Sequence, residues 1–346
     1  MEELCPMSIL NQACAFLQTK VLPYIPLQHQ KLFSFGFSAL TLQSFTSLNG
    51  NARMTIENRS TAESKIYRLV SNKDITKHFM DLVSGLHLVS PGERINVDFS
   101  TFCGYQVLTF AKQTSLGRAI PVYIAAITYP IENPGSQTQF IIAEVKKFMS
   151  LLGFSVHLVF DRGFELPYLA NSLTENHVNF TIRMKKDKHV LYMGKDIPLR
   201  NLPWFENDVV IGIYGKDIRV VRSEKLSERK DSEGKEEPWY LLTNDIKSTR
   251  DRVVADYYFR FEIEETFKDL KHVCELKSFY RIKKKQTFLV LLWFFMLSVW
   301  MAFLLEETKE YLSLRVTQNK HKKISIVRFF FEQISLEKNQ LFCMSP

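Results

Sequence analysis

Four residues with chemically useful side chains occur at fixed spacing in one stretch, residues 257–271. Tyr257, Arg260, Glu264 and Lys271 follow the pattern Y-x2-R-x3-E-x6-K. In a helix that turns by about 100° per residue, these positions fall within roughly 60° of arc. A carboxylate binds divalent cations, and guanidinium and ammonium groups bind phosphate oxygens. The stripe suits metal-assisted cleavage of a phosphodiester, although a solvated helix face with ion pairs carries the same residue types.

Two aspartates upstream offer further metal ligands. Asp98 interrupts the alternating apolar pattern of ERINVDFSTF (residues 93–102), which predicts a strand. An unpaired carboxylate is costly inside such a strand, so Asp98 requires either a charged partner or a metal ion. Asp161 ends the apolar run of SVHLVFDRGF (residues 155–164), and the carboxyl edge of a buried strand is a frequent catalytic position. The alternative for Asp161 is a turn residue that caps the next helix.

Asp98, Asp161 and Glu264 together form a carboxylate set of the kind that binds Mg²⁺, with Mn²⁺ as a substitute. Two such ions about 4 Å apart activate a water or a 3′-hydroxyl and stabilise the leaving oxygen of an in-line displacement. The five cysteines are scattered without a C-x-x-C pair, and the eight histidines show no zinc-binding pattern. The sequence therefore favours carboxylate-bound metal chemistry over a zinc hydrolase or a disulfide scaffold.

The elements that must position these acids begin with helices. Residues 1–90 are expected to be mainly helical, with Ser60 or Thr61 capping a helix that runs through Lys65. A predicted antiparallel meander follows, and a helix over 136–152 precedes the strand of Asp161. The strand-like stretches of the meander are residues 93–102, 105–112 and 119–130.

The second half of the chain combines a β-rich block with helices. Residues 165–238 contain short strand patterns, and the charged stretch 225–237 predicts an exposed hairpin tip or mobile loop. Residues 288–305 carry no charge, which fits either a membrane span or a fully buried helix. We expect burial, because this run is single and follows a segment that needs an aqueous active site.

The net charge of the chain favours an anionic partner. The 346 residues carry a formal charge of +8 and a pI near 9.1. Such a balance favours nucleic acid or a membrane surface, without choosing between them. The N-terminal residues lack the charged start and apolar run of a signal peptide, so a cytoplasmic protein is expected.

The order of these features resembles the bacterial insertion-sequence DDE transposases that carry the Y-R-E-K signature. The resemblance covers residues 51–305, with Phe261 standing where many relatives have tryptophan. It implies an α/β fold: an RNase H-like mixed sheet flanked by helices, with a β-rich insertion and helical N- and C-terminal regions. The implied domains are 1–90 (helical, DNA binding), 91–164 and 239–305 (the two parts of the catalytic core), 165–238 (insertion) and 306–346 (helical tail).

The resemblance also implies roles for individual residues. Asp98 and Asp161 would bind both metal ions and Glu264 one of them, whereas Arg260 and Lys271 would grip phosphates at the transposon end beside Tyr257. Other residues expected to contact DNA are Lys268, Arg162, Lys283, Lys284 and Lys285.

The partner implied by the resemblance is double-stranded DNA, as terminal inverted repeats and as target. A homodimer in a synaptic complex and no membrane partner are implied, with association to the bacterial nucleoid when DNA is bound. Two alternatives remain open from the sequence: a DNA-binding relative that has lost cleavage, and a membrane-associated protein anchored by residues 288–305.

Overall fold

The computed structural model describes residues 8–42, 58–130, 134–204, 208–213, 216–230, 236–274, 282–305 and 325–343. Of the predicted C-terminal tail, 306–346, only residues 325–343 are therefore described. The charged segment 231–235, at the centre of the predicted hairpin tip, also lies outside the described residues.

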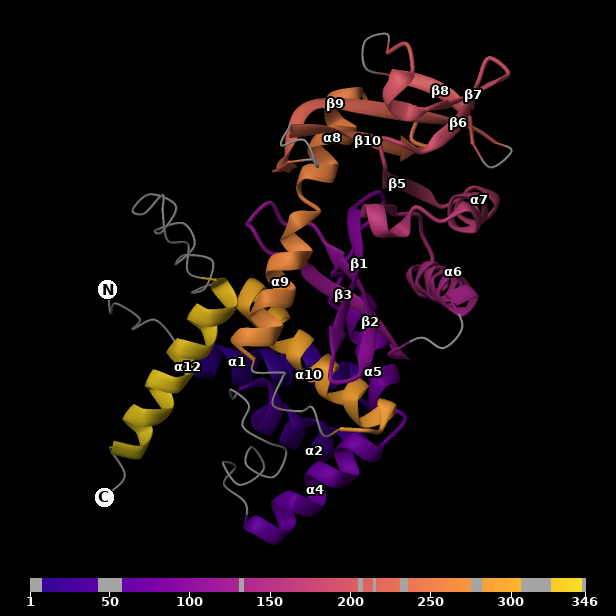
Figure 1. The fold of residues 1–346 in the computed structure, drawn as a ribbon. Helices are drawn as coiled ribbons and strands as arrows, with labels where there is room; N and C mark the ends of the chain where they lie inside the picture. Colours follow the sequence, from indigo (N-terminus) through magenta and orange to yellow (C-terminus); the bar gives the residue numbers. More distant parts are fainter. Residues whose placement is uncertain are drawn as a thin grey trace.

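One mixed sheet of ten strands runs through the molecule, in the order β3-β2-β1-β4-β5-β10-β9-β8-β6-β7 (Figure 1). Strands β1 to β3 form the predicted antiparallel meander. Strand β4 pairs parallel with β1, and β5 pairs parallel with β4. This 3-2-1-4-5 order with β2 antiparallel is the RNase H-like arrangement that the resemblance implied. The strands are β1 (Arg94–Phe102), β2 (Tyr105–Lys112), β3 (Ile120–Thr128), β4 (His157–Phe160), β5 (Asn179–Met184), β6 (His189–Tyr192), β7 (Lys195–Pro198), β8 (Asp208–Ile213), β9 (Lys216–Lys230) and β10 (Glu236–Thr243).

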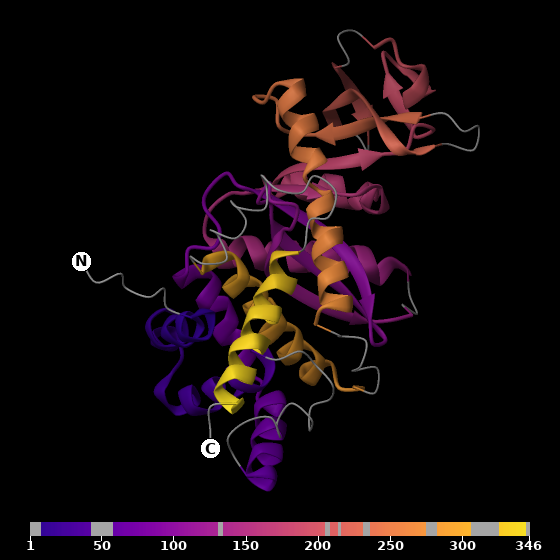
Figure 2. The same ribbon diagram turned by 90° about the vertical axis from the view of Figure 1, so that its left-hand side faces the viewer.

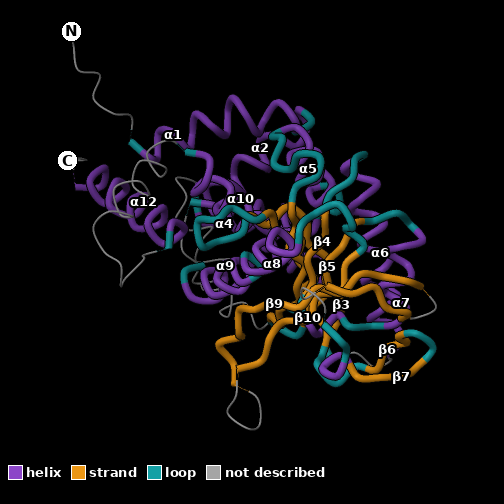
Figure 3. The backbone as a smooth tube through the Cα atoms, turned by 90° about the horizontal axis from the view of Figure 1, so that it is seen from above, coloured by secondary structure: helices purple, strands orange, loops and turns teal. Residues whose placement is uncertain are grey.

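Helices cover both faces of the sheet and fill the opposite end of the molecule. Helices α6 and α7 lie on one side of the parallel strands, and α8 and α9 lie on the other (Figures 1 and 3). The helices are α1 (Ile9–Phe16), α2 (Leu27–Gly36), α4 (Arg59–Ser71), α5 (Ile75–Gly85), α6 (Pro134–Leu152), α7 (Pro167–Glu175), α8 (Arg250–Tyr258), α9 (Phe261–His272), α10 (Lys285–Leu304) and α12 (Ile326–Cys343). Shorter π-helical and 3₁₀ turns are Leu17–Val21, Phe37–Thr41, Leu22–Tyr24, Arg162–Phe164 and Leu199–Asn201.

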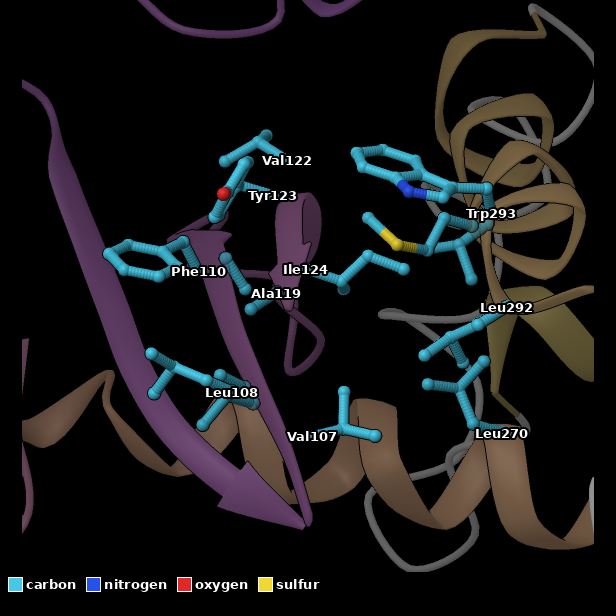
Figure 4. Close-up of a cluster of buried hydrophobic side chains, with 14 of the residues drawn as sticks. Val107, Leu108, Phe110, Ala119, Val122, Tyr123, Ile124, Leu270, Leu292 and Trp293 are labelled. Atoms are coloured by element: carbon cyan, nitrogen blue, oxygen red, sulfur yellow. The ribbon is translucent and has the colours of Figure 1, made fainter. Parts of the chain in front are cut away.

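The apolar run 288–305 forms most of α10, which is the centre of the helical end (Figure 2). Among the described residues, α10 is the one helix long and apolar enough to cross a membrane, but 83% of its apolar window is buried inside the protein. Trp300 donates from Nε1 to the carbonyl of Pro121 in β3 (2.6 Å). Figure 4 shows Leu292 and Trp293 of α10 facing the apolar side chains of β2 and β3. The predicted burial is confirmed, because α10 joins the sheet to the N-terminal helices.

A glycine allows the N-terminal helices to approach α10 closely. A Cβ atom on Gly36, at the end of α2, would lie 2.6 Å from side-chain atoms of both Leu69 and Phe294. The rings of Phe33 and Phe294 pack nearby, with centroids 5.1 Å apart. A side chain larger than hydrogen at residue 36 would displace Leu69 and Phe294, so glycine favours the close packing here.

Three local expectations differ from the structure. Asn58, rather than Ser60 or Thr61, caps α4, because its side-chain oxygen accepts from the Thr61 N–H (3.0 Å). The described ends of the charged stretch 225–237, predicted as a hairpin tip or mobile loop, lie in the antiparallel pair of β9 and β10, but β9 extends to Lys230 and so more of it is strand than expected. The predicted insertion boundary at residue 165 precedes β5, yet β5 pairs parallel with β4 and continues the core sheet.

The helix predicted over residues 257–271 is two helices. Helix α8 ends at Tyr258 and α9 begins at Phe261. The carbonyl of Phe259 accepts from Asn96 Nδ2 on β1 (3.0 Å) as well as from the Glu262 N–H (3.1 Å). The prediction of one continuous helix was wrong because this bond from the sheet holds the backbone at the junction.

Candidate active site

Strand register brings the two predicted aspartates together. In the parallel pair of β1 and β4, Val97 lies opposite Phe160. Asp98 and Asp161 each follow one of these residues, so they occupy equivalent places on neighbouring strands. Parallel strands end at the same edge of a sheet, and Asp161 lies immediately beyond β4 at this edge. The pairing of β1 with β4 thus brings together two acids that are 63 residues apart in the sequence.

Glu264 reaches this edge from the first turns of α9, and Arg260 connects it to the aspartates. Arg260 Nη2 donates to Glu264 Oε1 at 2.5 Å, and Nη1 donates to Asp98 Oδ2 at 3.3 Å. Its Nε atom lies 3.8 Å from Asp161 Oδ1. All three acids predicted from the sequence therefore surround the guanidinium of one arginine, and Arg260 as a whole is 2% exposed.

The pKa values of the two aspartates are governed mainly by burial and by the charge of Arg260. Burial raises the pKa of Asp98 to about 6, against the opposing effects of the Arg260 charge and the Phe99 N–H. Burial also disfavours the charged form of Asp161, but Arg260, the backbone N–H of Arg162, Tyr257 and Arg183 outweigh it and lower that pKa. Asp161 is thus the more firmly ionised of the two aspartates.

The charge on Arg260 is secured by its neighbours. Burial opposes that charge, yet Tyr257 and the three carboxylates together raise the pKa of the guanidinium above its ordinary value. The guanidinium carbon lies 5.7 Å from the centre of the Tyr257 ring and 4.7 Å from that of Phe261. Cation–π contacts of this kind favour the charged form in a desolvated site.

Tyr257 lies in the same cluster, on α8. Its hydroxyl donates to Asp161 Oδ1 at 3.1 Å, and burial raises the pKa of its phenol to about 12. The ring packs against Trp239 of β10 with centroids 5.0 Å apart. Tyr257 and Trp239 belong to a second apolar cluster that fixes α8 on the sheet, with Val159, Val221, Leu241, Val253 and Val254.

A ladder of polar contacts along β1 sets the position of α8 and of the helix break. Arg94 Nε donates to Asp256 Oδ2 at 2.6 Å, and Asn96 bonds the Phe259 carbonyl. Asp98 then meets Arg260. Alternate residues of a strand share one face, so Arg94, Asn96 and Asp98 all face α8 and α9.

The opposite face of α9 is fixed to the loop between β2 and β3. Glu262 accepts from the backbone N–H groups of Thr114 (2.8 Å) and Gly117 (2.9 Å). One turn later, Thr266 exchanges hydrogen bonds with the backbone of Ala119 (3.0 and 2.8 Å). These contacts hold α9 so that Glu264 faces the aspartates. The sequence offered little sign of Glu262's role, because its partners are backbone groups 145 or more residues away.

Arg183 is a further cation at the site that the sequence reasoning missed. It follows Ile182, which pairs with Phe160, so it lies beside Asp161 on the neighbouring strand. Its charge contributes to the lowered pKa of Asp161. Among the described residues, the Arg183 guanidinium forms no hydrogen bond or ion pair. The alternation of NFTIRM shows which residues share a face of β5, but only the pairing of β4 with β5 identifies the neighbour.

The other predicted DNA-contacting residues lie around the acid cluster and not within it. Lys271 Nζ lies 5.1 Å from the centre of the Phe102 ring, near the end of β1. Lys268 is exposed and pairs with Glu265 on α9. Arg162 directly follows Asp161, and the exposed Lys283, Lys284 and Lys285 lead into α10. The structure therefore unites Asp98, Asp161, Glu264, Arg260 and Tyr257, and places the lysines outside this group.

The donor set fits a hard divalent cation, because three carboxylates already converge on one positive group. Within the described part of the chain, no three acidic, histidine or cysteine side chains are arranged to hold a single metal ion. The reason is visible in the contacts, since the Arg260 guanidinium lies between the carboxylates. The three carboxylates are therefore suitable ligands for a divalent cation, but the Arg260 side chain occupies the position between them.

Comparison with known proteins gives one family match and two similar solved structures. Residues 142–300 match the family described as transposase DDE domain. No curated protein matches the chain. A cryo-EM structure of the piggyBac transposase synaptic complex with hairpin DNA is similar at a TM-score of 0.42 and 13% identity, covering 100% of this chain and 77% of that one. An X-ray structure of Marinitoga piezophila Argonaute in complex with 5′ OH guide RNA has a TM-score of 0.27 and 10% identity, covering 63% of this chain and 35% of that one.

The matched residues contain two of the three acids, Asp161 and Glu264, together with Tyr257 and Arg260. Asp98 precedes the match and is joined to it by the pairing of β1 with β4. The family match and the strand order agree: residues 142–300 of this chain match the transposase DDE domain family, and strands β1 to β5 have the RNase H-like order.

Proposed function

We propose that this chain is a DDE transposase of the Y-R-E-K group, which cleaves DNA at the ends of an insertion sequence and joins those ends to a target. The observation that carries this proposal is the meeting of Asp98, Asp161 and Glu264, from three separate elements, around one guanidinium. The transposase domain match over 142–300 supports the same reaction class.

Asp98, Asp161 and Glu264 would hold two Mg²⁺ or Mn²⁺ ions. When bound, the ions would supply Lewis-acid activation of the attacking water or 3′-hydroxyl and would stabilise the leaving oxygen. The lowered pKa of Asp161 keeps this carboxylate charged and ready to act as a ligand at neutral pH. Tyr257 donates its phenolic hydrogen to Asp161 and so orients that carboxylate.

Cations around the acids would hold the DNA strand. Arg183 lies beside Asp161 with its guanidinium free of hydrogen bonds to the described residues, and Lys271 lies near the end of β1. Arg and Lys at such positions bind phosphate oxygens. The exposed Lys268, Lys283, Lys284 and Lys285 would extend this surface, and the N-terminal helices would add DNA contacts. Synapsis of two ends would require a dimer.

Metal-dependent cleavage is the direct test. The substrate is duplex DNA carrying the sequences that flank this gene, where terminal inverted repeats are expected. Wild type is compared with Asp161→Asn and Glu264→Gln, in Mg²⁺, in Mn²⁺ and with EDTA. Glu265→Gln is the matched control, because the side chains of Glu264 and Glu265 are both 37% exposed on the same helix.

The proposal expects cuts at the repeat ends with wild type and Glu265→Gln, and none with EDTA or either active-site variant. Binding without cutting by the wild type would favour the alternative, a transposase-derived DNA-binding protein that has lost cleavage. Absence of both binding and cutting would contradict the DNA-directed function.

A further inference from the structure

Arg260 has a setting that phosphate gripping alone does not explain. An arginine that binds DNA presents its N–H groups to phosphate oxygens on a surface. The Arg260 side chain is 3% exposed, and its donors face Asp98, Asp161 and Glu264. In this arrangement the guanidinium is directed into the protein, towards the groups that would hold metal ions.

The contacts of Arg260 are also incomplete for a permanent ion-pair cluster. Only the bond to Glu264 is short, at 2.5 Å, whereas the contact with Asp98 is 3.3 Å and that with Asp161 is 3.8 Å. Its Nε atom is buried and forms no hydrogen bond with the described residues. A buried ion pair stabilises a protein only when its geometry and hydrogen bonding are good. The guanidinium thus bridges the three acids, but its contacts with Asp98 and Asp161 are long and its own Nε atom lacks a hydrogen bond to the described residues.

Resting on the proposed function, we propose that Arg260 is an internal counter-cation of the active site. It holds the three carboxylates together in the absence of metal, and it must withdraw from them before divalent ions bind. Arg260 is thus a positioning residue that sets the threshold for metal binding. The charge that it neutralises is the charge that the ions take over.

The surroundings of Arg260 are suited to such a withdrawal. It lies at the junction between α8 and α9, where the helical bonding is interrupted, so its backbone is not enclosed within a continuous helix. Phe261, whose ring covers the guanidinium at 4.7 Å, is itself 41% exposed. A DNA phosphate arriving on this side would offer the released guanidinium a new partner. DNA and metal would then bind cooperatively, because each favours the same position of Arg260.

Mn²⁺ binding to the full chain without DNA tests this inference. Electron paramagnetic resonance of free Mn²⁺ gives the dissociation constant for wild type, Arg260→Gln and Arg260→Lys. Loss of a positive charge among the ligands should tighten Mn²⁺ binding about ten-fold or more in Arg260→Gln. Arg260→Lys should be intermediate, because it keeps the charge but loses the bridging fork. Lys268→Gln, which removes an exposed cation of the same helix, is the control and should bind like wild type.

Two further measurements separate the possible failures. Thermal unfolding should show a larger Mn²⁺-induced stabilisation of Arg260→Gln than of wild type, and Asp161→Asn added to this variant should abolish the gain. If Mn²⁺ binding depends on Asp161 but neither Arg260 variant binds more tightly, the inference is overturned and the proposed function stands. If no variant shows Asp161-dependent Mn²⁺ binding, with or without DNA, both are overturned. Should Arg260→Gln fail to fold, the Arg260→Lys result decides.

Discussion

Two arginine-centred clusters lie on the same side of β1 and differ in their balance of charge. At the start of the strand, Arg94 pairs with Asp256 (2.6 Å) and Asp245 (3.5 Å), and Arg252 also pairs with Asp256 (3.0 Å). Two cations therefore meet two carboxylates. Four residues further along β1, Asp98 shares the single guanidinium of Arg260 with two other acids.

The difference separates a cluster with balanced charge from one with an excess of negative charge. In the Arg94 cluster the two bonds to Asp256 are short (2.6 and 3.0 Å) and the charges cancel, as expected of a contact that fastens α8 to the sheet. In the Arg260 cluster negative charge is in excess, and the pKa of Asp98 is raised to about 6 by burial among like charges. Excess charge of this kind costs folding free energy, and a bound cation would offset the part that Arg260 leaves uncompensated.

The largest expected effect comes from removing one charge in the unbalanced cluster. Asp98→Asn should lower the rate of DNA cleavage by about a thousand-fold, because it removes a metal ligand and with it several kcal/mol of transition-state stabilisation. The same change should leave the free energy of unfolding unchanged or slightly higher, since it relieves repulsion. Cleavage kinetics test the expected loss of rate, and urea unfolding tests the expected free energy of unfolding. A clear loss of stability would contradict the charge-excess interpretation.

The equivalent change in the balanced cluster should have the opposite profile. Asp256→Asn leaves Arg94 and Arg252 without their shared carboxylate, and Asp256 is 6% exposed. Removing one partner of a buried ion pair lowers the free energy of unfolding by about 3 kcal/mol. The free energy of unfolding should fall by this amount, while the folded fraction cleaves DNA at a rate near that of wild type. Loss of cleavage without loss of stability would assign Asp256 to the active site.

The Arg94 cluster also predicts a pH dependence through His157. Burial, aided by the Arg94 charge, lowers the pKa of His157 to about 3, so the folded protein holds it neutral. The unfolded chain binds a proton below its ordinary pKa near 6.5, so stability falls as the pH drops from about 6.5 towards about 3. At pH 5 the loss relative to pH 7 should be about 2 kcal/mol. His157→Gln should remove this part of the pH dependence, and an unchanged slope would contradict the prediction.

The three acids of the Arg260 cluster were accessible from the sequence, whereas the Arg94 cluster was not, and the reasons for the success are local. Asp98 and Asp161 stand out because each interrupts or ends an apolar strand pattern, and α9 shows clear helical spacing. The burial of α10 follows from its uninterrupted apolar run after a segment that needs water. These signals depend on one residue and its near neighbours, which a single sequence contains.

What the sequence could not supply depends on contacts between distant segments. The break between α8 and α9 arises from the bond between Asn96 and the Phe259 carbonyl, 163 residues apart. The buried setting of Arg260 depends on acids from β1 and from the end of β4, whereas helical spacing alone put it on an outward stripe. The position of Arg183 beside Asp161 follows only from the pairing of β4 with β5, which the sequence does not show.

Replacement of Arg183 should have the smallest effect of these changes, and it separates the role of Arg183 most clearly from that of Arg260. Both arginines lie close to Asp161, but the Arg183 guanidinium forms no hydrogen bond or ion pair with the described residues, so it is the one placed to meet phosphate. Arg183→Gln should weaken binding of end DNA roughly five-fold and lower the salt dependence of log K by about one phosphate contact. Arg200→Gln is the control, because Arg200 pairs with Asp187 (2.7 Å).

Titrations of labelled end DNA at several salt concentrations measure both quantities. Arg260→Gln, by contrast, should alter Mn²⁺ affinity strongly in the absence of DNA, and Arg183→Gln should alter it much less, because the Arg183 guanidinium acts on Asp161 without bridging the three acids. If Arg183→Gln left the salt dependence unchanged while it tightened Mn²⁺ binding, the two arginines would share one role. The distinction between a phosphate ligand and an internal counter-cation would then be wrong.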